Sequence, residues 1–457
     1  MRIVLIGLHF AEIVARLALA LSRDHDVEVY VAQPAADREW TQALRRETEA
    51  AVRVVYLPHP HRAWALWHGW RLARAVTRFA PDVVHVQEAA GWTVWAFLWL
   101  PRANFSWRRI ERRLSSWPGL SRPSTRLDHA SCPEETGSAW AIGDHRRRCG
   151  SASMAGTSLA MTASVVSAPA LAAPAFVLTV HDPHPHSGDA RARARTRWAD
   201  MRVRRRADGV IVHGEALVRA MEAQEPSLLG RIHAVPHGAL GVAARASPPP
   251  GKGRFLMFGR LQAYKGLGTL LDAVEILTAQ NRRFEVLIAG TGDDLERRRA
   301  RVACFATVKL DERYIPAEDV AALFGSCDAV VTPYLDATQS GVGALAFAAG
   351  RAVIATDVGA LREVVRDGEN GLIVPAGDAL RLAEAMARIL DEPGLAAQLG
   401  RCAREIAEGE LSWTGIAERT VRVYQTAREA KKERRRLGSL LKAAASAPPI
   451  HPGPDLD

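Results

Sequence analysis

The chain has 457 residues, of which 48% are hydrophobic and 24% charged. This composition is that of an ordinary globular protein, and the length is sufficient for two or three domains, so fibrous and wholly disordered classes are excluded. The formal net charge of +10 favours anionic partners such as phosphate-bearing small molecules, nucleic acid or an anionic membrane surface. Because no zinc-finger spacing or RNP-like aromatic motif accompanies the basic residues, we expect no nucleic-acid partner.

Cysteine usage and apolar patterning predict a cytoplasmic chain. The five Cys residues are an odd number without a C-x-x-C pair, which argues against a disulfide framework. Glu12 and Arg16 interrupt the apolar run at the N-terminus, so we interpret that run as a strand, a loop and a helix, not as a signal peptide. The stretch 159–178 is uncharged but rich in Ala, Ser and Pro, so we expect no transmembrane segment.

Strands and helices alternate through the first part of the chain. The run RIVLIG at 2–7 reads as a β-branched strand closed by glycine, and a helical pattern follows it. Further strands are expected at 27–32, 52–57, 82–86, 176–180 and 209–212, with helices at 11–22 and 70–79. This alternation predicts an α/β class, with a doubly wound, Rossmann-like parallel sheet whose ligand crevice lies at the carboxyl ends of its strands. We assign this N-terminal domain to 1–102 and 175–238.

One stretch does not follow the alternation. Residues 103–174 are rich in Ser, Ala, Arg and Pro and show no sustained period of 2 or 3.6. A structureless loop of this length inside a compact domain is uncommon, so we interpret the stretch as an inserted segment of low order. Cys132 and Cys149 lie within it, and a metal site there is a minor alternative because their spacing matches no standard template.

The alternation restarts after a Pro- and Gly-rich linker at 239–253. Strands are expected near 254–258, 284–289, 302–310, 329–331, 352–355 and 371–374, which predicts a second doubly wound domain over 254–412 that faces the first across a cleft. A last helix is expected at 413–436, followed by a disordered tail at 437–457. That helix ends in a basic cluster, which is either a solvated helix end or a contact with a membrane surface: Lys431, Lys432, Arg434, Arg435 and Arg436.

Two loops of the second domain carry groups suited to an anion. In the first, Arg260 and Lys265 stand five positions apart between a buried strand and a helix, with Gly259 and Gly266 beside them. Two cations at this spacing can converge on one diphosphate, and glycine permits close backbone approach; two surface cations flanking a helix start are the alternative.

The second loop, 333–342, also joins a strand to a helix. The backbone amides of Ser340, Gly341 and Val342 would open that helix, where free N–H groups and the helix dipole favour an anion. Because both loops follow the carboxyl ends of strands, we predict one phosphate group held between them.

These motifs together resemble a known family. Residues 259–266, VLIAGTG at 286–292, Tyr314 to Pro316, PYLDATQSG at 333–341, AVIATDVG at 352–359 and DGENGLIVPAGD at 367–378 are similar to the donor domain of retaining glycosyltransferases of the GT4 family, which have the GT-B fold. The similarity is strongest over 253–399 and weaker over the first domain, in PDVVHVQ, LTVHDPHPHSGD and VPHG.

The resemblance implies a nucleotide-sugar donor in the cleft between the domains. It implies that Arg260 and Lys265 neutralise the donor diphosphate as catalytic groups. It also places Gly259, Tyr314, Gln339, Ser340, Gly341 and Val342 at the donor. No metal and no other cofactor is expected, because side-chain cations and a helix N-terminus take over the charge neutralisation.

One feature departs from the family pattern. The family carries two glutamates eight positions apart, and alignment on the PY loop puts Gln339 and Phe347 at these positions. Gln339 can still hydrogen-bond a donor-sugar hydroxyl without charge, whereas Phe347 cannot accept from a ribose diol.

In the first domain the resemblance makes His181 a catalytic or positioning group near the donor sugar, with Asp182 on the acceptor side. A zinc site formed by His181, His184 and His186 is a weaker alternative, as is a loop of solvated histidines.

The acceptor is predicted to be a glycan or a lipid-linked sugar of envelope or exopolysaccharide assembly. Six tryptophans are expected mainly in packing and partly in an interfacial patch, which fits a peripheral contact with the inner membrane face: Trp64, Trp67, Trp70, Trp92, Trp95 and Trp99. Two other functions stay open. The chain is either a transferase, a non-catalytic protein that binds sugar nucleotides or glycans, or a sugar-nucleotide epimerase that needs no acceptor.

Overall fold

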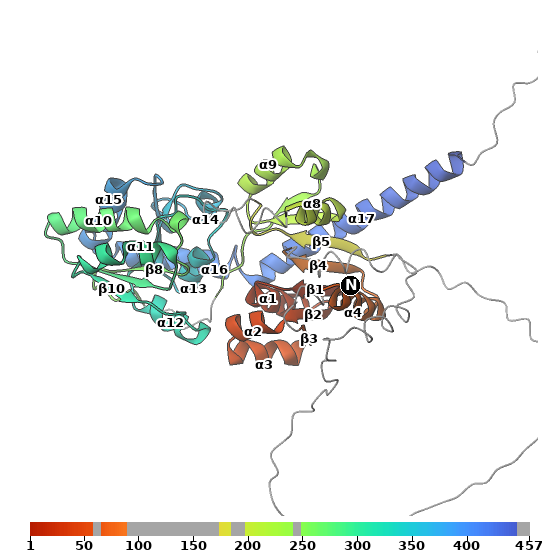
Figure 1. Cartoon of the computed structure of the whole chain (residues 1–457), viewed down its shortest axis with the longest axis horizontal. Helices are drawn as coiled ribbons and strands as arrows, with labels where there is room; N and C mark the ends of the chain where they lie inside the picture. The colour runs from red at the N-terminus through yellow and green to blue at the C-terminus, as the bar shows by residue number, and fades with distance from the viewer. Residues whose placement is uncertain (58–64, 89–172, 184–196, 241–247, 446–457) are drawn as a thin grey trace, which may run out of the picture. The chain divides into compact units, whose positions relative to one another are not determined.

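A computed structural model describes residues 1–57, 65–88, 173–183, 197–240 and 248–445 of the chain (Figure 1). The insertion predicted at 103–174 therefore lies outside the described residues, apart from its last two positions, and its low order stays a prediction.

The first domain is a seven-stranded parallel sheet with the strand order β3-β2-β1-β4-β5-β6-β7. At the centre of the sheet, Ile3 pairs with Val27 of one neighbouring strand and with Val83 of the other. The strands are continuous apolar runs because helices cover both faces. They are β1 (Arg2–Gly7), β2 (Asp26–Ala32), β3 (Arg53–Leu57), β4 (Val83–Gln87), β5 (Ala175–Thr179), β6 (Gly209–Val212) and β7 (Ile232–Ala234).

The helices of this domain are α1 (Ala11–Leu21), α2 (Gln33–Glu39), α3 (Gln42–Ala51), α4 (Ala65–Phe79), α8 (Arg197–Arg206), α9 (Glu215–Gln224) and the 3-10 turn η3 (Pro226–Leu228). A helix from the far end of the chain, α17 (Trp413–Ala445), also packs on this domain, against α1, β5 and β6. Its side chains Tyr424 and Ala427 are part of the first hydrophobic core.

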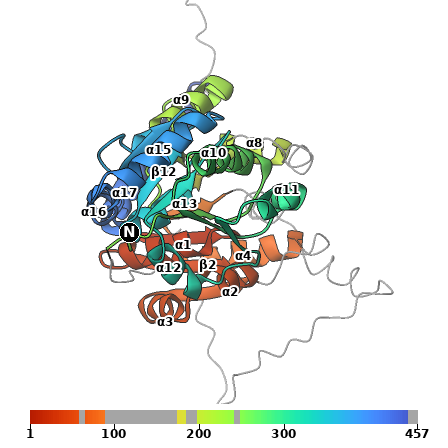
Figure 2. The ribbon, with the colours of Figure 1, turned by 90° about the vertical axis from the view of Figure 1, so that its left-hand side faces the viewer.

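The second domain is a six-stranded parallel sheet with the order β10-β9-β8-β11-β12-β13. Its strands are β8 (Arg254–Phe258), β9 (Glu285–Ala289), β10 (Val308–Asp311), β11 (Ala329–Thr332), β12 (Ala352–Thr356) and β13 (Gly371–Val374). Its helices are η4 (Ala263–Lys265), α10 (Leu267–Ala279), α11 (Asp293–Ala303), α12 (Ala317–Gly325), α13 (Gly341–Ala348), α14 (Leu361–Val364), α15 (Ala379–Asp391) and α16 (Leu395–Glu408). Figure 2 shows α10 and α15 side by side, as their packing requires.

Separate hydrophobic clusters fill the two faces of the second sheet. One lies under α10 and α15, and the other lies between the sheet and α13, α16 and the PY loop. The prediction of two doubly wound, Rossmann-like domains is confirmed.

The boundary of the last helix differs from the prediction. We expected a helix at 413–436 and a disordered tail from 437, whereas α17 continues to Ala445. Residues 437–445 (LGSLLKAAA) contain Leu, Lys and Ala, which have high helix propensity, and Gly438 is the only strong breaker among them. The basic cluster therefore does not mark the end of the helix.

Candidate functional site

The order of the strands in the second sheet reverses between the parallel neighbours β8 and β11, and this is where a ligand crevice is expected. β9 and β10 extend the sheet on one side of β8, while β11 to β13 extend it on the other. The loops that follow β8 and β11 therefore diverge to opposite faces of the sheet. These are the two loops that the sequence singled out, the one with Arg260 and Lys265 and the one with the PY motif.

Glycines lock these loops together. Gly266 has φ 74°, and a Cβ atom there would overlap the carbonyl oxygen of Pro333 in the PY loop. Gly290 has φ 135°, and a Cβ atom there would overlap the carbonyl oxygen of Gly259. Both positions thus require glycine for conformation and for close approach, and the spacing of the loops is set by backbone contact.

Lys265 lies against aromatic rings. Its Nζ is 3.9 Å from the ring centroid of Tyr334 and 5.1 Å from that of Tyr264. Burial acts to lower the pKa of Lys265, but the two tyrosines outweigh it, so the pKa lies above its ordinary value and the side chain stays charged.

Arg260 is exposed on the same loop. A Cβ atom on its neighbour Gly259 would lie 3.8 Å from Val342, in the first turn of α13. Within the described part of the chain, neither Arg260 nor Lys265 forms an ion pair with a carboxylate. Two cations without an anionic partner at a topological switch point are suited to an anionic ligand.

Helix α13 begins beside the ring on which Lys265 lies, since Ser340 Oγ is 3.4 Å from the Tyr334 hydroxyl. Ser340 is its N-cap, and Ser340 Oγ accepts a hydrogen bond from the Gly343 amide at 3.0 Å. This cap satisfies one amide of the first turn and leaves those of Gly341 and Val342 available to an external acceptor. The predicted amides therefore lie at a helix N-terminus beside the two cations.

A cavity of about 270 Å³ adjoins Gly259 and Arg260. Tyr314 lines it, is 60% exposed, and donates a hydrogen bond from its hydroxyl to the carbonyl oxygen of Arg38 at 2.9 Å. Gly290, Thr291 and Leu345 also line it. The cavity brings Gly259, Arg260 and Tyr314 together, and their role at a donor stays a prediction.

Phe347, which the alignment puts at the position of a family glutamate, lies away from this cavity. Its side chain is fully buried in the cluster beneath α13 and does not line this cavity; it borders, with Gln339, a separate void of about 30 Å³. Leu345, two residues earlier on the helix, is the side chain that reaches the cavity. Two residues correspond to about 200° of helical rotation, which exchanges the core face for the opposite one.

Gln339 lies apart from that cavity. It borders a small void of about 30 Å³ together with His213 and His237, and its Oε1 is buried without a hydrogen-bond partner among the described residues. An unpaired buried acceptor is costly, so this atom calls for a donor group such as a hydroxyl or a water molecule.

His181 is fully buried. Its ring stacks on Phe10 with centroids 3.9 Å apart, and its Nε2 lies 3.0 Å from the side-chain amide of Gln87. His213 donates from Nδ1 to the Val235 carbonyl at 3.0 Å, so its Nε2 accepts from His181 Nδ1 at 2.9 Å.

Burial is the first cause that lowers the pKa of His181 well below its ordinary value, and the ring is neutral. Its Nδ1 is therefore the donor to His213, and its Nε2 can only accept, so a hydrogen bond to Gln87 requires the side-chain amide of Gln87 to present its N–H group there. Beside His181, Asp182 accepts a hydrogen bond from the Thr338 hydroxyl at 2.5 Å.

The sequence reasoning missed most of the network around His181. His85 bonds to the Tyr424 hydroxyl of α17 and to Thr179, each at 2.7 Å, and Gln87 lies between His85 and His181. The signal was a polar residue at every second position of an otherwise apolar strand, VVHVQ, since residues i and i+2 share one face of a sheet.

Several alternatives fall on residues outside the described ranges. These include the proposed zinc ligands His184 and His186 and the cysteines Cys132 and Cys149. Within the described ranges, no group of three or more His, Cys, Asp or Glu side chains is arranged to hold a metal ion. None of the helices in those ranges has the length and apolarity needed to cross a membrane.

Comparison with known proteins matches both halves of the chain. Residues 252–392 match the family model described as Glycosyl transferases group 1, and residues 11–110 match Glycosyltransferase Family 4. The phosphatidyl-myo-inositol mannosyltransferase of Mycolicibacterium smegmatis is 32% identical over 201 residues, which cover 42% of this chain and 51% of that protein. The D-inositol 3-phosphate glycosyltransferase of Saccharomonospora viridis is 31% identical over 202 residues, covering 42% and 47%. The aligned part of this chain thus spans about half the length of these relatives.

Solved structures share the fold at low sequence identity. HepE of Anabaena, solved with UDP-glucose, superposes with a TM-score of 0.58 at 15% identity, covering 93% of this chain and 99% of that one. Sucrose-phosphate synthase of Thermosynechococcus elongatus gives 0.57 at 20% identity, covering 93% and 98%. The chain therefore belongs to the GT4 family of glycosyltransferases and has the GT-B fold.

Proposed function

We propose that the chain is a retaining hexosyltransferase that moves a sugar from a nucleotide-sugar donor to a glycan or lipid-linked acceptor, without a metal. One observation carries the proposal: two cations, Arg260 and Lys265, have no carboxylate partner in the described part of the chain, at a switch point beside the start of α13. The names of the mannosyltransferase and inositol-phosphate glycosyltransferase relatives support the reaction class.

The donor diphosphate is assigned to the two loops that Gly266 holds in contact. Arg260 supplies forked N–H donors, Lys265 supplies a point charge, and the amides of Gly341 and Val342 complete the set. These groups face the charge that develops on the leaving diphosphate, which is why we expect no metal ion. Removing one preorganised donor of this kind typically costs about 2.7–4 kcal/mol of transition-state stabilisation.

The donor sugar is assigned to the neighbourhood of Gln339. Its unpaired Oε1 is an acceptor beside a void of about 30 Å³, which has room for one hydroxyl group of a sugar that enters from outside the void. A nucleotide-sugar donor agrees with the UDP-glucose complex of HepE, which shares the fold. Titration with different nucleotide sugars identifies the base and the sugar of the donor.

Retention follows if the acceptor attacks from the face that the diphosphate leaves. In that step a phosphate oxygen of the leaving group takes the acceptor proton, and the cations stabilise the charge. Asp182 is assigned to the acceptor side. His181 is enclosed by Phe10 and His213, so we assign it as a positioning residue for the loop that carries Asp182.

The test starts with calorimetric titration of UDP-, GDP-, ADP- and dTDP-sugars, followed by turnover of the donor that binds. Arg260→Gln and Lys265→Gln should each lower kcat/KM more than tenfold. Lys252→Gln and Arg297→Gln remove exposed cations of the same domain and should leave it unchanged. Full activity of either site variant would contradict the assignment.

The same assay separates the alternative functions. A transferase releases nucleotide only in proportion to acceptor, and NMR of the product shows the donor's anomeric configuration. Turnover without acceptor would indicate an epimerase, and binding without turnover of any donor and acceptor pair would indicate a binding protein. A chelator should change nothing, and loss of activity on chelation would contradict metal independence.

A further inference from the structure

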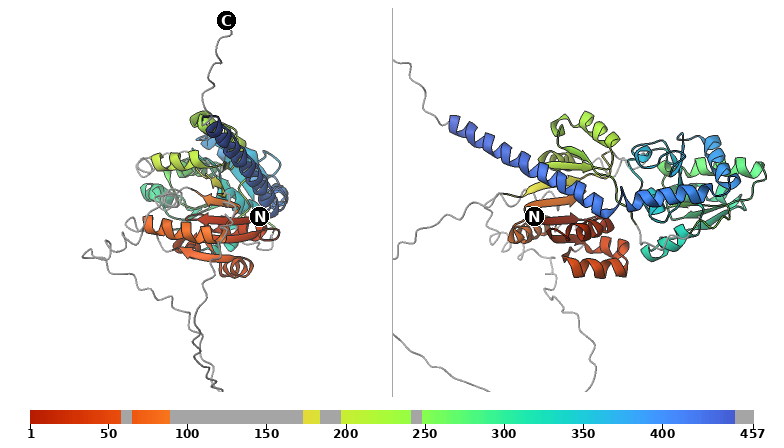
Figure 3. Two further views of the ribbon diagram at one scale, coloured as in Figure 1. Left: turned by 90° about the vertical axis from the view of Figure 1, so that its right-hand side faces the viewer. Right: turned by 180° about the vertical axis from the view of Figure 1, so that it is seen from behind.

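The end of α17 carries large apolar side chains in solvent. Leu437, Leu440 and Leu441 are 49%, 57% and 71% exposed. From Lys432 to Leu441 every residue except Gly438 is exposed, and we call residues 432–441 the tip of α17. Figure 3 shows the blue helix continuing past the first domain at this end. Three exposed leucines within five residues form a patch and not scattered surface residues.

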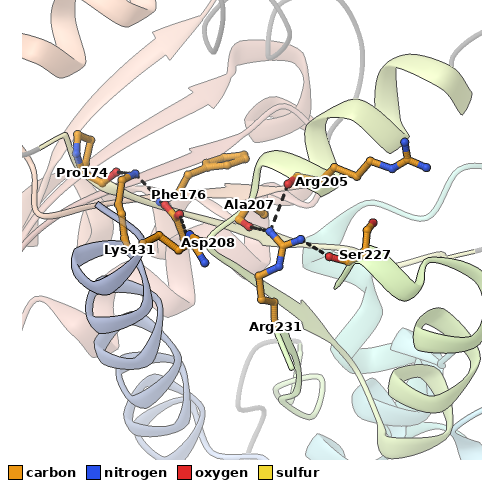
Figure 4. Close-up of polar contacts among 9 residues, drawn as sticks. Pro174, Phe176, Arg205, Ala207, Asp208, Ser227, Arg231 and Lys431 are labelled. Carbon is orange, nitrogen blue, oxygen red and sulfur yellow. Dashed lines mark hydrogen bonds and ion pairs between the residues drawn. The ribbon is translucent and has the colours of Figure 1, made fainter. Parts of the chain in front are cut away.

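The helix is anchored just before this patch. Asp208, at the start of β6, accepts hydrogen bonds from the Phe176 amide and from Lys431 Nζ, each at 2.8 Å, and pairs with Arg434. Lys431 also donates to the carbonyl oxygen of Pro174 at 2.6 Å, as Figure 4 shows. Two cations of the basic cluster are therefore engaged by the domain, which fixes the direction in which α17 leaves it.

The remaining cations of the cluster have no such role. Lys432, Arg435 and Arg436 are exposed and form no ion pair with the described residues. Glu433 offsets one of the three charges, so the free charge of the tip is positive.

Helical geometry separates the two kinds of side chain. At about 100° per residue, Leu437, Leu440 and Leu441 occupy an arc of about 100°. On the same projection Lys432 and Arg435 lie on the side opposite that arc, and Arg436 borders it. At about 1.5 Å per residue, the leucines stand about 5 to 10 Å beyond Arg434 along the axis, clear of the anchored turn.

We infer that the tip of α17 docks on the surface of an anionic lipid bilayer. The apolar arc, with Arg436 at its border and Lys432 and Arg435 on the opposite side, matches a helix that lies in the headgroup plane with its leucines toward the acyl chains; the long Lys and Arg side chains reach back to the lipid phosphates. A second copy is disfavoured as the occupant because two tips would bring their net positive charges together. This inference does not rest on the proposed function, since it uses no residue of the candidate site.

Flotation of the full chain with lipid vesicles tests whether the tip of α17 binds a bilayer. Vesicles of phosphatidylcholine with 30% phosphatidylglycerol should bind the chain, and vesicles of pure phosphatidylcholine should bind it at least tenfold more weakly. The triple change Leu437→Gln, Leu440→Gln and Leu441→Gln keeps helix propensity and should lower the partition coefficient at least tenfold. A matched control makes the same change at exposed leucines elsewhere and should bind as the parent does: Leu229, Leu310 and Leu380.

The contribution of charge is tested in the same way, with a matched control. Changing Lys432, Arg435 and Arg436 to Gln should lower binding at least tenfold, whereas changing Arg46, Arg219 and Lys252, which alters net charge equally, should not. Circular dichroism and thermal unfolding of each variant establish that it is folded.

Equal binding of the tip variants and their controls would overturn the inference. A concentration-dependent dimer in ultracentrifugation without lipid, lost in the triple leucine variant, would assign the patch to a second copy and overturn it as well. Donor binding of the leucine variant should equal that of the parent, so a failure here is distinguishable from a failure of the proposed function.

Discussion

Replacing Gly266 with Ala should separate the two loops that form the candidate donor site. Gly266 adopts φ 74°, where an L-residue costs about 1–2 kcal/mol. A Cβ there also overlaps the backbone carbonyl of Pro333, and a carbonyl cannot swing aside as a long side chain can. Forced overpacking adds about 1–3 kcal/mol. The sum predicts a loss of about 2–5 kcal/mol of unfolding free energy.

Gly368→Ala is the matched control. Gly368 has nearly the same conformation, φ 76°, but nothing lies within 4 Å of a Cβ built there. Its loss should therefore be the conformational part alone, about 1–2 kcal/mol. Urea denaturation of the two variants beside the parent gives the difference, which isolates the contact between Gly266 and Pro333.

The same overlap also has a functional consequence. Relieving the overlap requires the loops to part by about 1 Å, and a misplacement of that size can reduce rate about 10²-fold. We expect Gly266→Ala to weaken donor binding at least tenfold by calorimetry at a temperature where it is fully folded, and Gly368→Ala to leave it unchanged. Equal donor affinity in both variants would refute the view that backbone contact sets the donor site.

Three further predictions follow from the packing and the charges. Phe347→Ala should cost about 3–5 kcal/mol in urea denaturation, and Leu345→Ala less than about 1.5 kcal/mol, because Phe347 is fully buried whereas Leu345 is only partly buried against the same cluster. The reverse order would contradict the assignment of the two faces of α13. Burial lowers the pKa of His85 to about 3. The neutral form of His85 therefore contributes stability that is fully present above about pH 6.5 and is lost at about 1.4 kcal/mol per pH unit as the pH falls. A urea midpoint that is constant between pH 7.5 and 5 would contradict this. Asp208→Asn should destabilise the chain by about 1–3 kcal/mol and speed hydrogen exchange in α17. The control Asp391→Asn removes an exposed ion pair and should cost less than about 0.5 kcal/mol. Equal effects would show that Asp208 does not anchor the helix.

Local patterning was sufficient for the elements and for the donor-side loops. Apolar runs bounded by glycine identify parallel strands because both faces of each sheet are covered by helices. The cations Arg260 and Lys265 could be predicted as a pair because a strand, a glycine-rich loop and a helix follow each other within a short stretch. Sequence spacing alone could then place both cations at one sheet edge.

The faces of α13 could not be predicted in this way. Its sequence, GVGALAFA, is apolar at every position, so periodicity does not distinguish a core face from a ligand face. Alignment on the PY loop selected Phe347, and only packing against the second core showed that Leu345 is the residue at the cavity.

By itself the sequence determined the α/β class, the order of the strands along the chain, the two loops with their glycines and cations, and the family. Each of these depends on residues near one another in the chain, where backbone geometry relates spacing to position. Only the tertiary structure decided that His181 is enclosed by Phe10 and His213, and that α17 packs on the first domain, where Asp208 binds Lys431. These contacts join residues far apart in sequence, and no local period encodes which distant side chain meets which.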